Sequence, residues 1–474
     1  MQQPARRTVS ALAITLLCCT GLTMILEGCA ANSAPDAAPA VATPTTVQAP
    51  PAPAVPSAPT QKPLTADESD PNKMGWMQGF PPPPDRTIRF DLAGNMFPRT
   101  RYGYSHVREF VPTRAVWHGD GPVSKLPRAE RDISGVLFTD TDGTRRTFAE
   151  ALKLTYTDGI LVMHKGKVVY ERYFGALDAH TQHIAMSVTK SFVGTLAAML
   201  VADGKLDPAA PVTQYVPELK DSAYGDATVR QVMDMTVGVH YSENYADPNA
   251  DVWAYARAGG MLPRPVGYKG PDNFYDYLKT LRKEGEHDAE FSYKTVNAET
   301  LAWIVRRASN TSLAALLSER IWQPMGAQDD AYFQVDSIGA ESGGGGLNTT
   351  LRDLARFGEM IRNDGRFNGR QILPKSVIDD IRRGGSSEES RAKFAKAGYA
   401  TLPGYSYRNM WWVSNNDHHT FEARGIHGQR IYIDPVAQMT IVRYASHPIA
   451  ANAANDPVTH RAYAALAEHF MQHK

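Results

Sequence analysis

Cysteine is almost missing from this sequence of 474 residues: the only three are Cys18, Cys19 and Cys29, close to the amino terminus. The rest of the chain therefore has no disulfide, no cysteine nucleophile and no thiolate metal site. No pair of histidines has metalloprotease spacing, so we expect no metal, and no cofactor is expected either. A charge excess is missing as well, because 50 Lys and Arg balance 50 Asp and Glu. This balance argues against nucleic acid as the main partner.

Long apolar runs are also scarce, with one exception at residues 9–26, which follow Arg6 and Arg7. The run is too short for a comfortable membrane span and predicts a secretory signal. It ends in Leu-Glu-Gly-Cys-Ala, residues 26–30, which resembles a bacterial lipobox despite the glutamate. We expect residues 1–29 to be a signal and lipoprotein leader, with lipidation at Cys29 as the membrane anchor. Plain cleavage nearby or an uncleaved anchor are the alternatives. We expect an exported protein of the cell envelope or periplasm.

The next segment contains little that can form a core. Residues 30–70 are rich in Ala, Pro, Thr and Val and poor in charge over most of their length, which predicts an extended tether. The folded body is then expected over residues 71–474, with order from near Met74. Its first part, up to about residue 150, is rich in Pro, Arg and aromatic residues and predicts irregular structure that packs on the body.

Strand patterns lie at both ends of the body and helical patterns lie between them. A hairpin is expected over residues 159–174, with its turn at His164-Lys-Gly-Lys. Further strands are expected at 410–413, 429–433 and 440–444, and helices at 186–202, 228–235, 299–307 (with Asn297 as cap), 351–363 and 459–471. We expect an α+β fold: an antiparallel sheet flanked by helices, with an inserted, mainly helical subdomain. The glycine-rich loop 342–346 lacks the lysine and spacing of a phosphate loop.

One S-x-x-K segment, Ser187-Val-Thr-Lys190, opens the apolar helix expected over 186–202. Residues three apart share a helix face, so the lysine amine can take the serine proton. A serine at a helix start also has a free backbone N–H that can donate to an oxyanion. A second S-x-x-K, Ser390 to Lys393, lies in a polar stretch, and we expect it to be a solvated loop.

A serine–lysine hydrolase needs a further group that moves protons and a second oxyanion donor. Tyr293, just before a helix, is the candidate for the first, and a lysine cation beside it could lower its pKa from about 10 towards 7. Residues 423–429, with two glycines, are the candidate for the second.

Taken together, this ordered set resembles the serine hydrolases of the class C β-lactamase and DD-peptidase superfamily, and within it the 6-aminohexanoate-dimer (nylon-oligomer) hydrolase branch. The segments that carry the resemblance are 77–82, 187–190, 241–243, Tyr293 with Asn297, 352–356 and 425–429. The resemblance implies that Ser187 is the nucleophile, Lys190 its base and Tyr293 the acid/base of the second motif. It also implies an oxyanion hole from the N–H groups of Ser187 and Ile426. The implied substrate-binding residues are Tyr245, Asn297, Gly425 and His427, although packing is the alternative for His427.

Three positions depart from the family pattern. Thr295 fills the third place of the second motif, where Asn or Ser is usual, and Ala423 replaces the lysine of the third motif, although Arg424 could substitute. Ala256 occupies the place of a carboxylate that helps to hold the substrate amine in the nylon-oligomer enzyme.

Tyr407-Arg-Asn409 matches the usual second motif literally, but its place in an aromatic run before the last strands predicts cross-strand packing instead. We expect an exported serine hydrolase that cleaves amide or ester bonds of small substrates through a Ser187 acyl-enzyme. The alternatives are a penicillin-interactive DD-peptidase or β-lactamase, and a catalytically inactive envelope binding protein.

Overall fold

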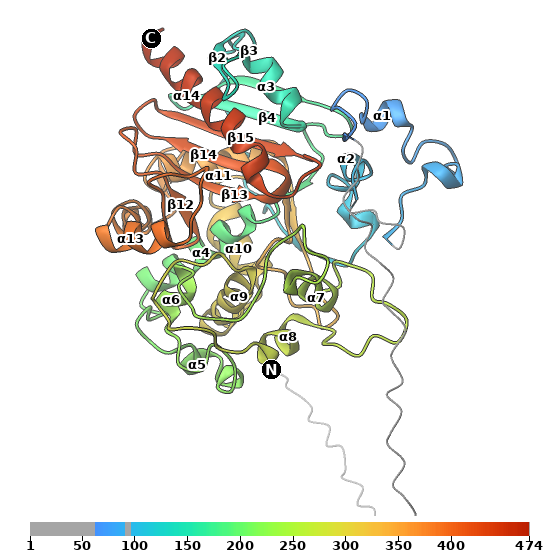
Figure 1. Ribbon diagram of the computed structural model, residues 1–474. Coiled ribbons are helices and arrows are strands. Elements are labelled where there is room, and N and C mark those ends of the chain that lie inside the picture. The colour runs from blue at the N-terminus through green and yellow to red at the C-terminus, as the bar shows by residue number, and fades with distance from the viewer. Residues whose placement is uncertain (1–61, 91–95, 474) are drawn as a thin grey trace, which may run out of the picture. The chain divides into compact units, whose positions relative to one another are not determined.

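The structure, a computed structural model, describes residues 62–90 and 96–473 (Figure 1). Its central feature is a seven-stranded antiparallel sheet in the order β11-β12-β13-β14-β15-β4-β5. The strands are β4 Thr157–His164, β5 Lys167–Tyr173, β11 Ser406–Arg408, β12 Trp411–Val413, β13 Phe421–Gly425, β14 Gln429–Asp434 and β15 Met439–Ala445. The two chain ends meet in one sheet, so the α+β expectation is confirmed.

The expected hairpin over 159–174 is confirmed as β4 and β5, joined at Lys165 and Gly166. Side chains alternate between the faces of β4: Ile160 and Val162 join one core, whereas Leu161 and Met163 join the other. The strand is therefore buried on both faces, which requires helices on each side of the sheet.

Helices cover both faces. On one face α14 Asp456–Gln472 packs with α3 Phe148–Leu154, and on the other α11 Leu351–Arg362 lies against β4, β14 and β15. The helix α4 Val188–Ala202 packs beside α11 on that second face, against β13 and β14. Figure 1 shows α14 above the sheet and α4 below it. The helices expected at 186–202, 351–363 and 459–471 are thus confirmed.

Beyond α4 the chain forms the expected mainly helical region. Its helices are α5 Val212–Tyr215, α6 Val229–Met233, α7 Asp251–Ala258, α8 Phe274–Thr280, α9 Thr295–Ser309 and α10 Leu313–Leu317. The helix α9 packs against α4, and residues Thr295–Val305 of α9 are buried on every side. It begins at Thr295, so Asn297 lies inside the helix and the expectation that it caps the helix is wrong.

A second sheet was not expected from the sequence. It has four strands in the order β1-β7-β8-β6: β1 Thr113–Val116, β7 Ala331–Gln334, β8 Leu347–Thr349 and β6 His183–Ile184. These strands are too short to show a period-2 pattern. The sheet has a functional consequence, because β6 delivers the chain directly to Ser187.

The amino-terminal segment differs from the expectation at its boundary. Asp67 forms an ion pair with Lys153, and the Leu64 carbonyl accepts a hydrogen bond from Tyr156. Residues 62–70, assigned to the tether, therefore contact the folded body. The expected leader, Cys29 and the rest of the tether lie outside the described residues. Over the ranges 62–90 and 96–473, no helix combines the length and apolarity needed to cross a membrane.

Candidate active site

Ser187 lies at the junction of β6 and α4, where it is the N-cap residue of the helix. Met186 before it has a left-handed φ of 47°, which turns the chain sharply from the strand into the helix. Lys190, one turn later, donates from Nζ to Ser187 Oγ at 2.8 Å and to the Gly344 carbonyl at 2.5 Å. The predicted serine–lysine contact is therefore present.

Lys190 is 1% exposed, and among the described residues no carboxylate forms a salt bridge with it. Burial disfavours the ammonium form and lowers the pKa of Lys190 to about 8, although the negative charges of Glu243 and Glu299 oppose the shift. The shift corresponds to about 3 kcal/mol, and at pH 7 about one lysine in ten is then a free amine. This amine can accept the Ser187 proton.

Tyr293 completes the group. The Lys190 Nζ lies 5.3 Å from the centroid of the Tyr293 ring, and the tyrosine hydroxyl interacts with Ser187. Burial and the charge of Glu243 raise the pKa of Tyr293 well above 10. The lowered pKa expected from the sequence is therefore wrong, because burial of the hydroxyl and the charge of Glu243 both favour the neutral phenol. A neutral phenol beside Ser187 can donate a proton but is a poor base.

The end of β13 contacts the segment that precedes the nucleophile. A Cβ atom on Gly425 would lie 2.7 Å from the Ala185 carbonyl oxygen and 3.0 Å from the Met186 Cβ. A side chain at 425 would thus separate these two segments, which explains the glycine. Ile426 follows directly, so the two residues predicted to form the oxyanion hole, Ser187 and Ile426, lie at the ends of adjoining segments.

His427 is held by its neighbours. Its Nδ1 hydrogen-bonds to the His447 carbonyl at 2.7 Å, its backbone N–H donates to Ala450, and its ring packs edge-on against Tyr104. Burial lowers the pKa of His427 to about 4, so the ring is neutral near pH 7. These contacts match the packing alternative, and substrate binding by His427 remains a prediction.

Glu243 and Tyr245 lie on the loop before α7 and meet the start of α9. The Tyr245 hydroxyl donates to Glu243 Oε1 at 2.8 Å, and Thr295 donates to Glu243 from both its backbone N–H, at 2.6 Å, and its hydroxyl, at 2.7 Å. The glutamate thus caps α9 and places Tyr245 beside Tyr293. Thr295, the departure from the family pattern, is accounted for by this contact.

Asn297, predicted to bind substrate, has no exposed surface. Its Oδ1 accepts a hydrogen bond from Tyr224 at 3.1 Å, inside the helical region. The structure therefore does not bring Asn297 to a surface where a substrate could touch it.

Arg424 could have replaced the missing lysine of the third motif, but both its terminal nitrogens are occupied. They pair with Glu422 at 3.0 Å and with Asp456 at 2.6 Å, and Arg430 pairs with the same two carboxylates. The guanidinium also lies 5.0 Å from the centroid of the Trp412 ring. Arg424 is therefore part of a buried charge network.

The structure also shows the surroundings of the two segments that match the site motifs literally, at Tyr407 and at Ser390. Tyr407 is 3% exposed, pairs with Trp412 across the sheet and contacts the ring of Phe291, as packing predicts. Ser390 and Lys393 lie in a helix, α13 Glu388–Lys396, so the expected loop is wrong.

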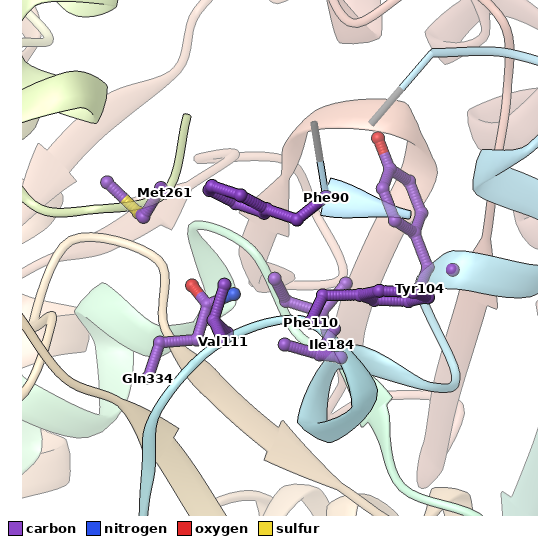
Figure 2. A pocket seen from close by; sticks show the side chains of 9 residues that line it. Phe90, Tyr104, Phe110, Val111, Ile184, Met261 and Gln334 are labelled. Atoms are coloured by element: carbon purple, nitrogen blue, oxygen red, sulfur yellow. The ribbon is translucent and has the colours of Figure 1, made fainter. Parts of the chain in front are cut away.

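A small apolar pocket of about 30 Å³ lies beside the segment that leads to Ser187. Figure 2 shows Phe90 and Met261 across this space from Val111 and Gln334, with Ile184 and Tyr104 at its other end. Met186 packs against the neighbouring cluster of Tyr104, Val107, Ile184 and Tyr332. The cavity is too small for a whole substrate, and its lining includes none of Ser187, Lys190 and Tyr293.

Two residues of the site were missed from the sequence. Gly344 supplies the carbonyl that binds Lys190, and Glu299 accepts the Gly344 N–H at 2.6 Å. The glycine-rich loop 342–346 matches no known site pattern in the sequence, and Glu299 lies within the expected helix 299–307, where no sequence pattern marks it as a site residue. In the described part of the chain, no cluster of His, Cys, Asp and Glu could hold a metal ion.

The chain matches a family model and several known proteins. The family model described as Beta-lactamase matches residues 144–465. The 6-aminohexanoate-dimer hydrolase of Paenarthrobacter ureafaciens is 34% identical over 351 residues, which are 74% of this chain and 86% of that protein. Esterase EstB of Burkholderia gladioli is 26% identical over 194 residues, 37% of this chain and 47% of the esterase.

Solved structures also match this chain. A protein from Bacillus anthracis, described provisionally as a 6-aminohexanoate-dimer hydrolase, matches with a TM-score of 0.74 and 32% identity, covering 82% of this chain and 99% of its own. An octameric penicillin-binding protein homologue from Pyrococcus abyssi matches with a TM-score of 0.52 and 18% identity, covering 68% of this chain and 76% of its own, and supports the fold alone.

Proposed function

The chain belongs to the beta-lactamase family and, within it, to the branch similar to 6-aminohexanoate-dimer hydrolases; on this premise we propose an exported serine hydrolase that cleaves amide or ester bonds through an acyl-enzyme on Ser187. One observation carries the proposal: Ser187 Oγ is hydrogen-bonded to a buried lysine that has no salt bridge among the described residues. Such a lysine exchanges a proton near neutral pH, as a base for serine must.

In the first step Ser187 Oγ attacks the carbonyl carbon of the substrate while its proton moves to Lys190 Nζ. The developing oxyanion lies between the N–H groups of Ser187 and Ile426. Tyr293, a neutral phenol, donates its proton to the leaving amine or alkoxide and regains one from Lys190. Water then attacks the acyl-enzyme: its proton passes to Lys190 Nζ, the bond between the acyl carbon and Ser187 Oγ breaks, and Lys190 returns the proton to Oγ as the acid product leaves.

The charges near the site favour substrates without a carboxylate at the recognised end. Glu243 is negative and has no cationic side-chain partner among the described residues, whereas Arg424 is neutralised by Glu422 and Asp456. A β-lactam or a D-Ala-terminated peptide brings a carboxylate that would meet like charge here. We therefore propose neutral or amine-bearing small amides and esters as substrates.

Ala256 argues against assigning the 6-aminohexanoate dimer as the substrate. It lies on α7 and is 9% exposed, in the place where the nylon-oligomer enzyme has a carboxylate for the substrate amine. Glu243 hydrogen-bonds to Tyr245 and acts electrostatically on Tyr293, so it is the carboxylate proposed to attract a substrate amine.

Turnover of p-nitrophenyl butyrate and of short p-nitroanilides tests the proposal, with Ser187→Ala as the control. We expect ester turnover by the wild-type protein and an acyl adduct on Ser187 in a quenched sample, detected by mass spectrometry. Labelling by a fluorescent penicillin at a comparable rate would favour the β-lactamase or DD-peptidase alternative. No adduct with any ester, amide or penicillin would favour an inactive binding protein.

Export and anchoring are a separate proposal from the sequence of the leader. We propose that Cys29 is lipidated and that the proline-rich tether spaces the hydrolase from the membrane. Mass spectrometry of the native amino terminus should find a diacyl- or triacyl-modified Cys29, and an unmodified terminus at another residue would contradict the anchor.

A further inference from the structure

Glu299 is a buried carboxyl group that the proposed mechanism does not use. It lies in α9 and is 1% exposed. Three donors converge on its Oε1: the Tyr255 hydroxyl at 2.8 Å, the Ser342 hydroxyl at 3.0 Å and the Gly344 N–H at 2.6 Å. Its Oε2 is buried and has no hydrogen-bond partner among the described residues. A carboxylate is costly to bury in this way unless a positive charge compensates it.

The same glycine joins Glu299 to the catalytic lysine. The Gly344 N–H donates to Glu299, and the Gly344 carbonyl accepts from Lys190 Nζ at 2.5 Å. A Cβ atom at this position would lie 2.5 Å from Thr295 Cγ2, 2.8 Å from the Tyr255 hydroxyl and 3.1 Å from Glu299 Oε1. The backbone is thus packed directly against the carboxyl group, and the position of the Lys190 acceptor depends on Glu299.

The charged groups around the pair come from α4, α9, the loop before α7 and, through Glu341, the segment between β7 and β8. Lys190 on α4 experiences the charges of Glu299 on α9 and of Glu243 on the loop before α7. Glu299 also experiences Arg306 on its own helix, but the Arg306 guanidinium pairs with Glu341. Burial raises the pKa of Glu299, whereas the Gly344 N–H, Arg306, Tyr255 and Ser342 oppose that rise. Of the two cations that act on or beside Glu299, Arg306 stays paired with Glu341, whereas Lys190 can gain or lose its charge during the reaction.

We infer that Glu299 is a positioning residue for Lys190: its carboxylate fixes Gly344, which holds the lysine amine against Ser187, and it stabilises the ammonium formed when Lys190 takes the serine proton. This inference rests on the proposed role of Lys190. The O–H bond of Ser187 breaks, the proton passes to Nζ and Oγ bonds to the carbonyl carbon. Glu299 keeps its negative charge throughout, so only the lysine changes its protonation state.

The test is the pKa of Lys190 in Glu299→Gln, measured by NMR on protein labelled with ¹³C at the lysine ε-carbon, with Lys190→Ala for assignment. Loss of the negative charge should lower that pKa by about one unit, from its wild-type value near 8. Ser342→Ala is the matched control, because it removes one hydrogen bond to Oε1 and no charge, and it should move the pKa by less than about 0.3 unit. Glu299→Asp, which keeps the charge, should restore most of the wild-type value.

An unchanged Lys190 pKa in Glu299→Gln would overturn the inference. If that variant does not fold, the wild-type protein still decides: the ¹³Cδ signal that is lost in Glu299→Asp must report a carboxylate at pH 8, and a protonated carboxyl group there contradicts the role. The rate of Ser187 phosphonylation by a neutral fluorophosphonate separates this result from the proposed function. If Glu299→Gln reacts with an unshifted pH midpoint, only the role of Glu299 is rejected. If the wild-type protein does not react at all, the hydrolase mechanism is rejected, and the NMR result alone then tests the coupling between Glu299 and Lys190.

Discussion

Two segments of this protein carry the same S-x-x-K pattern at the start of a helix, and they differ in almost every physical property. Ser187 is the N-cap residue of α4, and Lys190 is buried with its amine on the serine oxygen. Ser390 is the third residue of α13, and its backbone N–H already donates to Ser387 Oγ at 3.2 Å. Both serines lie in the first turn, where helix amides lack partners within the helix, but the Ser390 amide is already satisfied by the Ser387 side chain.

The lysines differ even more. Lys393 pairs with Glu389 at 2.6 Å and with Asp288 at 2.7 Å, and these carboxylates raise its pKa above the usual 10.5. Lys190 has a lowered pKa because it is buried without such a pair. The same two side chains at the same spacing thus form a base in one place and a surface ion pair in the other. The pattern specifies geometry, and the surrounding core decides the chemistry.

The largest effect should separate the two serines. Ser187→Ala removes the nucleophile and should lower kcat/KM for an ester by about 10⁴-fold or more, leaving what binding and the oxyanion donors supply. Ser390→Ala should change it by less than about twofold, since its hydroxyl only donates to the Tyr407 carbonyl at 3.3 Å. Steady-state assays of both variants measure the contrast, and similar losses would contradict it.

Substitution of the two lysines should give the next largest difference in activity. Lys190→Ala should lower acylation by about 10³-fold, because no base remains for the serine proton. Lys393→Ala should leave kcat unchanged and alter the free energy of unfolding by about 1 kcal/mol or less, as surface ion pairs do. Circular dichroism and urea unfolding check that both variants are folded. Near-normal turnover by folded Lys190→Ala is incompatible with the mechanism.

A third contrast opposes two tyrosines that lie 6.2 Å apart between ring centroids. Tyr293→Phe should lower kcat by about a hundredfold or more, the scale for loss of an acid/base group. Tyr407→Phe should lower it by less than about tenfold, because that hydroxyl contacts only the Met410 sulfur, at 3.6 Å. The reverse ranking in a kcat measurement would overturn the assignment of the second motif.

The smallest effect is the dependence on pH. Acylation needs Lys190 as the free amine, so kcat/KM should fall about tenfold for each pH unit below the lysine pKa near 8 and level off above it. Lys393 titrates above pH 8, so it should not affect the dependence of kcat/KM on pH in this range. A flat profile between pH 6 and pH 8 would contradict a lysine base with this pKa.

Local patterns were sufficient for most of the fold. The hairpin, the three later strands and the helix of Ser187 were predicted, because each has a period of alternation or of helical spacing that survives folding. Strands of the second sheet, such as β6 with two residues, carry no such period. The helix cap at Asn297 was predicted wrongly, because the group that caps α9 is Glu243, about 50 residues earlier in the chain.

For the site, the sequence supplied the reacting groups but not their environment. Ser187, Lys190 and Tyr293 were predicted, and the structure brings them together. The direction of the Tyr293 pKa was wrong, because it depends on burial and on Glu243 rather than on a neighbour in the sequence. Gly344 lies 154 residues from Lys190, and no local pattern predicts that contact.

The most direct test of the account is to map every serine that reacts with a fluorophosphonate in the native protein, by tryptic digestion and tandem mass spectrometry. We expect one modified residue, Ser187, whose labelling disappears in Lys190→Ala, while Ser390 stays unmodified under the same conditions. Modification of Ser390, or labelling of Ser187 at an undiminished rate without Lys190, would contradict the claim that burial of the lysine turns this S-x-x-K into a catalytic pair.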